Sequence, residues 1–101
     1  MPTPLLGKQK RYLRAEAHAL KPVVQVGKGG ASAALLHQID EALAAHELIK
    51  VQFVAEKEEK QALAEAAEFQ LGAALAGQVG HVLILYRPHQ EPKKRRYRLP
   101  Q

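Results

Sequence analysis

The sequence of 101 residues contains no cysteine and no tryptophan, and three tyrosines and two phenylalanines are its only aromatic residues. Without cysteine the chain cannot form disulfides, thiolate zinc sites, iron–sulfur clusters or a cysteine nucleophile. Ser32 is the only serine, and no serine–histidine–aspartate set accompanies it. The five histidines are scattered without metal-ligand spacing. These absences argue against an enzyme, and we expect neither a metal nor a cofactor.

Long apolar runs are also missing. No stretch reaches the roughly 18 residues that a membrane span needs, and residues 1–12 contain lysines but no apolar core of a signal peptide. We therefore expect a soluble, cytoplasmic protein with no membrane partner. The length suits one domain, and 47% apolar with 25% charged residues is a globular composition.

Charge is divided along the chain. The net charge is +5 over residues 1–30, −5 over residues 31–86 and +5 over residues 87–101. A polyanion is therefore expected to meet the two basic ends, because the acidic middle repels it. The simpler alternative is that the basic ends only aid solubility.

Hydrophobic periodicity predicts seven elements in the order α-β-α-β-α-β-β. The helices are expected over residues 7–20, 32–46 and 56–71, and the strands over residues 23–26, 48–54, 73–79 and 81–86. This order favours a single small two-layer α/β domain with a four-stranded mixed sheet, in which the first three strands are largely parallel and a hairpin adds the last one antiparallel. Residues 1–88 would form the domain, and residues 89–101 a flexible basic arm, because the arm has little apolar surface to bury.

The sharpest motif is a glycine-rich loop, Gly27-Lys28-Gly29-Gly30, between a predicted strand and a helix that Ser32 caps. Glycines let a ligand approach the backbone closely, and Lys28 and the helix N-terminus favour phosphate. A tight turn that needs glycine for positive φ is the alternative. The loop fits neither a Walker motif nor a dinucleotide fingerprint, so we expect a nucleic-acid phosphate rather than ATP or NAD.

The first predicted helix is basic on one flank. Lys10, Arg14, Arg11 and Lys8 follow one another round the helical wheel beside an apolar stripe. We expect this flank to neighbour the glycine loop and to bind phosphates together with it. Tyr12 on the same helix either stacks on a base or belongs to the core.

Four separate blocks resemble one family: residues 7–14 (GKQKRYLR), 20–30 (LKPVVQVGKGG), 46–51 (HELIKV) and 85–88 (LYRP). They are similar to the CRM domain family, the RNA-splicing and ribosome-maturation domains, in its bacterial stand-alone YhbY type. The similarity spans about residues 5–88 in the same order. Leu6 departs from the pattern, because relatives often have a threonine there that could cap the first helix.

The resemblance implies an RNA-binding α/β domain similar to the C-terminal domain of translation initiation factor three. It also implies association with the precursor of the large ribosomal subunit, where the protein would act in ribosome assembly. The RNA-contacting residues it implies, together with those predicted above, are Gly27, Lys28, Gly29, Gly30, Lys8, Lys10, Arg11, Arg14, Lys21 and Tyr12.

The leading hypothesis is therefore a monomeric, ribosome-associated RNA-binding protein that is not an enzyme. Charge alone adds candidate contacts in the arm, namely Lys93, Lys94, Arg95, Arg96 and Arg98. The alternative is an adaptor whose acidic middle docks a ribosomal protein or translation factor. A small enzyme acting on a phosphate-bearing substrate would need a titratable pair that the sequence does not offer.

Overall fold

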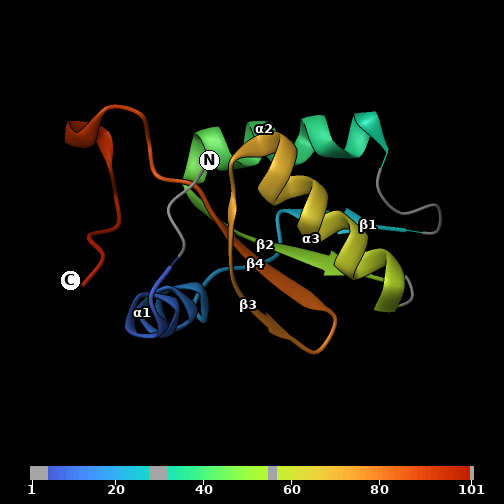
Figure 1. Cartoon of the computed structure of the whole chain (residues 1–101), viewed down its shortest axis with the longest axis horizontal. Helices are drawn as coiled ribbons and strands as arrows, with labels where there is room; N and C mark the ends of the chain where they lie inside the picture. The colour runs from blue at the N-terminus through green and yellow to red at the C-terminus, as the bar shows by residue number, and fades with distance from the viewer. Residues whose placement is uncertain (1–4, 28–31, 55–56, 101) are drawn as a thin grey trace.

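The computed structural model describes residues 5–27, 32–54 and 57–100. Over these residues the chain follows the predicted order α-β-α-β-α-β-β and then adds one short turn of 3₁₀ helix (Figure 1). The elements are α1 (Gly7–Ala17), β1 (Val24–Val26), α2 (Ala33–His46), β2 (Leu48–Phe53), α3 (Lys57–Leu71), β3 (Ala74–Val79), β4 (Val82–Tyr86) and η1 (Pro92–Lys94).

The starts of the first two helices follow from local hydrogen bonds. Ser32 caps α2 as predicted, since its hydroxyl accepts a hydrogen bond from the Leu35 N–H at 3.1 Å. Leu6 has no side-chain acceptor, but its own N–H donates to the Gln9 side chain at 2.9 Å. Half of a capping box therefore holds the start of α1. The helix ends at Ala17, three residues before the predicted end.

The sheet has the strand order β1-β2-β4-β3. β1 pairs parallel with β2, and β4 pairs antiparallel with both β2 and β3. The first three strands therefore run in one direction, as predicted, and the last strand of the hairpin is inserted between β2 and β3. Gly80, with φ +57°, makes the turn of that hairpin.

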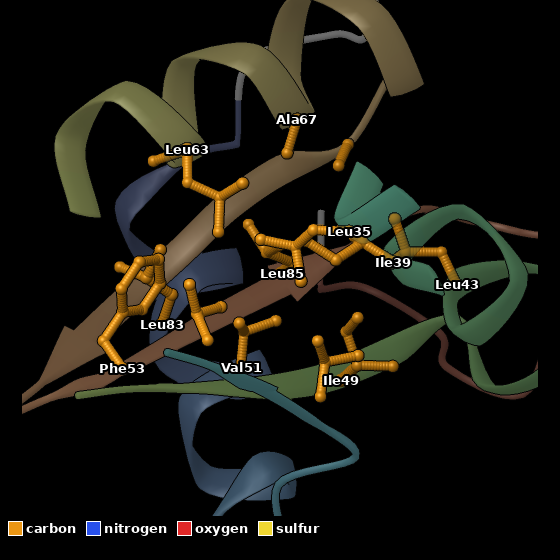
Figure 2. Packing of buried hydrophobic residues seen from close by; sticks show 14 residues of the cluster. Leu35, Ile39, Leu43, Ile49, Val51, Phe53, Leu63, Ala67, Leu83 and Leu85 are labelled. Carbon is orange, nitrogen blue, oxygen red and sulfur yellow. The ribbon is translucent and has the colours of Figure 1, made fainter. Parts of the chain in front are cut away.

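The small α/β domain with its mixed sheet is as predicted, but the expected two layers are three, because helices cover both faces of the sheet. On one face α2 and α3 bury a large apolar cluster, which Figure 2 shows above the strands. Ile49, Val51 and Phe53 of β2 point into it, as the alternation along that strand predicted.

α1 packs on the opposite face. Its buried residues Leu13 and Ala17 meet Leu48, Ile84 and Tyr86 in a second cluster. β4 is a continuous run of apolar residues, so other elements must cover both of its faces. α1 supplies the second cover and makes the third layer.

The C-terminal segment, residues 89–100, also differs from the expected flexible arm. It packs against α1 and the second cluster through Tyr97 and Leu99. The rings of Tyr97 and Tyr86 meet edge to face with centroids 6.5 Å apart, an arrangement typically worth about 0.5–1.5 kcal/mol. Two apolar side chains at alternate positions are enough to dock a short segment that runs beside an existing core.

Glu47 holds the same segment from the other side. It follows α2 with φ 64°, and only 3% of it is exposed. Its Oε1 accepts a hydrogen bond from the Arg96 N–H at 2.6 Å, while Oε2 is buried without a partner among the described residues. Glu47 is thus the anchor of the C-terminal segment.

Two sequence expectations concern metal sites and membrane spans. Within residues 5–27, 32–54 and 57–100, no three acidic or histidine side chains gather as metal ligands would. In the same ranges no helix has the length and apolar character to cross a bilayer.

Candidate nucleic-acid interface

The outer surface of α1 is cationic. Lys8, Lys10, Arg11 and Arg14 are all exposed, and the first turn of the helix contains no acidic residue. None of the four takes part in an ion pair with another described residue. Their charges are therefore available to an external anion.

Arg14 is placed by strand β3 rather than left to move freely in solvent. Its Nη1 donates to the Ala76 carbonyl at 3.3 Å, and its side chain crosses Gly77 at an irregularity in the pairing of β3 with β4. A Cβ at Gly77 would lie 2.6 Å from Arg14 Cδ. The glycine thus leaves the room in which the arginine lies flat on the sheet.

Of the glycine-rich loop, Gly27 is within the described residues, while Lys28, Gly29 and Gly30 lie outside them. Gly27 is exposed, its φ is not positive, and a Cβ there would meet no atom of the other described residues within 4 Å. The turn alternative therefore does not account for glycine at this position. Close approach of a ligand remains a reason for it.

The basic helix was expected to neighbour the loop, but Gly27, the one described residue of the loop, lies away from it. α1 covers the end of the sheet where Leu48 begins β2, whereas Gly27 follows Val26, which pairs with Phe53 at the other end of β2 (Figure 1). The five steps from Leu48 to Phe53 span about 17 Å at the usual rise of a strand. The basic surface of α1 and Gly27 are thus two separate places on the molecule.

The sheet surface between them is not covered by a helix. Beyond α1, the face of the sheet opposite α2 and α3 carries Lys50, Gln52 and Gln25, of which the two glutamines are exposed and the lysine is half-buried. No acidic side chain stands on this face in the described strands. A chain of negative charge could therefore cross from α1 towards Gly27 without meeting a like charge.

Tyr12 and Lys21 occupy different environments. Tyr12 is half-buried and packs against the second cluster, so the structure favours a core role for its ring over stacking on a base. Lys21 is exposed on the connection between α1 and β1. Lys21 therefore extends the cationic surface from the helix towards the sheet.

The end of the C-terminal segment lies beside α1, and its basic residues precede that end. The segment is tied to α1 by a hydrogen bond of 3.1 Å from the Gln9 side chain to the Pro100 carbonyl. Lys94 lies 3.5 Å from Glu91, and Arg95 Nε donates to the His89 carbonyl at 2.8 Å. The predicted arm residues are all exposed, namely Lys93, Lys94, Arg95, Arg96 and Arg98.

Burial affects the pKa of two tyrosines, Tyr86 in β4 and Tyr97 in the segment itself. Burial raises the pKa of both Tyr86 and Tyr97 above the usual tyrosine value, and nearby carboxylates add to the effect, from Glu47 for Tyr86 and mainly from Glu16 for Tyr97. Both rings are therefore neutral at physiological pH. They act as apolar packing with a hydroxyl at the edge.

Sequence reasoning missed three residues of this region. Gln25, Gln52 and Lys50 belong to no predicted site, and no motif distinguishes them. A signal is present in the alternation of apolar and polar residues along β2, which is typical of a strand with one less buried face. That this face stays open depends on where α1 ends, which the alternation cannot show.

Comparison with known proteins adds independent information. The model of the CRS1 / YhbY (CRM) domain matches residues 5–87. The "Probable RNA-binding protein YqeI" of Bacillus subtilis is 44% identical over 91 residues, which are 89% of this chain and 95% of that protein. An "RNA-binding protein" of Haemophilus influenzae is 44% identical over 92 residues, covering 90% and 93% of the two chains.

A solved structure agrees with the fold. The solution structure of a hypothetical protein from Staphylococcus aureus superposes with a TM-score of 0.79 at 39% sequence identity. The match covers 95% of this chain and 99% of that one. The small α/β domain with a four-stranded mixed sheet is therefore shared with an experimental structure.

Proposed function

Because the chain belongs to the CRS1 / YhbY (CRM) domain family, we propose that it binds RNA through the basic surface of α1 and the loop that begins at Gly27. Its RNA would be ribosomal, within the precursor of the large subunit, where the protein would act in assembly without catalysing a reaction. Relatives named as RNA-binding proteins support the first part. The resemblance to ribosome-maturation domains supports the second.

The observation that carries the proposal is the unpaired cationic surface of α1. Phosphate contacts supply most of the affinity of a nucleic-acid-binding protein, and they need exposed cations without competing carboxylates. Acidic residues gather instead on the outer surfaces of α2 and α3, where Glu41, Glu65 and Glu68 are exposed. The two sides of the molecule thus differ in charge, and only the α1 side suits a polyanion.

A salt titration tests RNA binding directly. If about five phosphates of single-stranded RNA are neutralised, affinity should fall roughly a hundredfold between 50 and 200 mM salt. Changing both Lys10 and Arg14 to glutamine removes two charges and should lower the dependence of log affinity on log salt by about 1.4. The measurement is fluorescence anisotropy with labelled RNA at several salt concentrations.

A matched control keeps net charge from explaining the result. Changing Gln38 and Gln70 to glutamate alters the net charge by the same amount on the exposed surfaces of α2 and α3. This control should bind RNA almost as the wild type does. A flat salt response of the wild type, or equal losses in both variants, would count against the proposed surface.

The ribosomal target needs its own experiment. Crosslinking the protein to RNA in cells and reading the crosslinked nucleotides should return positions in large-subunit ribosomal RNA. Crosslinks spread over messenger or transfer RNA would contradict that part of the proposal and leave RNA binding itself intact.

The adaptor alternative has one observation in its favour. Phe69 on α3 is 83% exposed, and the carboxylates of Glu65 and Glu68 lie on the same helix. Such a surface could meet a basic ribosomal protein. A pull-down treated with RNase separates the two cases, since protein partners that persist favour the adaptor and partners that are lost favour RNA binding.

A further inference from the structure

One row of side chains crosses the uncovered part of the sheet. Gln25 of β1 pairs with Gln52 of β2, Gln52 with Val82 of β4, and Val82 with Val79 of β3. Side chains directly opposite one another on neighbouring strands point to the same face. These four therefore form a continuous line across the whole sheet, on the face that α1 covers only at its other end.

The row combines groups that need a partner. The side-chain amides of Gln25 and Gln52 are exposed and form no hydrogen bond with another described residue. Val79 is 63% exposed, an unusual degree for a valine on a sheet, and Val82 is half-buried. Two amides beside two isopropyl groups offer hydrogen bonds and apolar contact over a width of about 14 Å.

The row is also held in place. The hairpin that carries both valines is fixed at His81, whose carbonyl accepts from the Phe53 N–H at 2.7 Å. The Lys60 ammonium, on α3, donates to His81 Nδ1 at 3.2 Å. These two contacts tie the turn between Val79 and Val82 to β2 and α3.

Its neighbours along the strands are the proposed phosphate contacts. The next row of paired residues on this face, towards α1, contains Lys50, since Lys50 pairs with Ile84 and Ile84 with Gly77. The side chain of Arg14 lies over Gly77 in that row. Gly27 follows two residues after Gln25. Each step of two residues covers about 7 Å, which is close to the spacing of successive phosphates in an extended single strand.

We propose that the row of Gln25, Gln52, Val82 and Val79 contacts the bases of single-stranded RNA, and so joins the α1 surface to the glycine loop. This inference rests on the proposed RNA-binding function and names its substrate class. The amides would hydrogen-bond to base edges and the valines would contact base faces, while the backbone lies along Arg14, Lys50 and Gly27.

The chemistry of the row selects unpaired bases. In duplex RNA the bases are stacked and paired inside the helix, and their edges lie in grooves that a flat sheet does not enter. A four-stranded sheet is wide enough for two or three splayed bases. Because the row contains no aromatic ring, it would read base edges more than it would stack on base faces.

The test changes Gln25 and Gln52 to alanine together. Affinity for a labelled single-stranded RNA of about 12 nucleotides should fall about tenfold, because each well-placed amide contributes to base recognition. The salt slope should stay unchanged, since no charge is removed. Changing Gln38 and Gln70 to alanine on α2 and α3 is the control and should leave the affinity as it was.

The outcomes separate the two proposals. If the wild type binds no RNA in a salt-dependent way, the proposed function itself fails. If the wild type binds but the Gln25 and Gln52 variant binds equally well, or if duplex RNA binds as tightly as the single strand, the role of the row is overturned. That role also fails if the variant keeps its RNA affinity but loses an RNase-resistant protein partner. Circular dichroism of each variant establishes that the fold is intact.

Discussion

At the scale of single residues, Gly27 and Gly77 show two uses of a missing side chain. Gly77 makes room for Arg14, which would collide with a Cβ at 2.6 Å. Gly27 has no positive φ and no other described residue close to where its Cβ would lie, so neither backbone strain nor packing against the described residues requires glycine there. The structure thus explains glycine at position 77, and the proposed RNA contact would explain it at position 27.

Gly27→Ala should therefore weaken RNA binding without harming the fold. The added methyl group meets no atom of the other described residues, so thermal stability should stay the same or rise slightly through a less flexible unfolded chain. RNA affinity should fall several-fold, because the methyl group would keep the RNA from approaching the backbone closely. Paired measurements of melting temperature and anisotropy check this, and unchanged affinity would remove Gly27 from the interface.

At the scale of elements, the C-terminal segment has the least expected position. Its composition suggested a flexible arm, yet Tyr97, Leu99 and the Glu47 anchor dock it on α1 and the sheet. Docking holds its five exposed cations, at positions 93–96 and 98, on the folded domain. The cationic surface is thus assembled from both ends of the chain, in keeping with the division of charge along the sequence.

Glu47→Ala tests this anchor. The Arg96 N–H loses its acceptor, which should cost about 1–3 kcal/mol of stability, and the φ of 64° is equally strained for alanine. Hydrogen exchange at the Arg96 amide should speed up more than exchange in β4. The matched control is Glu91→Ala on the exposed part of the segment, expected to change stability by less than about 0.5 kcal/mol. If the Arg96 amide of the Glu47→Ala variant exchanged hydrogen at the wild-type rate, the carboxylate would not hold the segment.

The elements also show how far sequence reasoning reaches. Hydrophobic patterning located all seven helices and strands, because the helices bury one regular face and β4 is a continuous apolar run. It could not show that α1 covers the opposite face from α2 and α3, since an apolar stripe does not say which side of a sheet it meets. Nor could it show that β4 enters between β2 and β3, or that residues 50 and 52 stay uncovered. Those facts depend on contacts between segments far apart in the chain.

At the scale of the whole molecule, the structure has two unlike sides. The α1 side presents cations and an open strip of sheet, and the side of α2 and α3 presents carboxylates and Phe69. In the proposed function, the predicted single site of helix and loop becomes an extended path between α1 and Gly27, at the two ends of β2 about 17 Å apart. An extended single strand suits such a path better than a compact ligand does.

Stability of the whole fold should fall in alkaline solution. Burial raises the pKa of Tyr86 and Tyr97 in the folded state, so unfolding makes both hydroxyls easier to ionise. Their contribution is complete below the unfolded tyrosine pKa of about 10 and is lost as pH rises through the higher folded value. Melting temperatures from pH 8 to 11, with Tyr97→Phe for comparison, check this. If the melting temperature fell equally with rising pH in the wild type and in the Tyr97→Phe variant, Tyr97 would not be responsible for the alkaline loss of stability.

The most direct test of the RNA path is a titration of the isotopically labelled protein with single-stranded RNA, followed by the backbone amide shifts in NMR spectra. Shift changes should gather at Lys10, Arg14, Gln25, Gly27 and Gln52, and should be small on the outer surfaces of α2 and α3. Changes that gather around Gln38, Phe69 and Gln70, with the α1 side unaffected, would contradict the account.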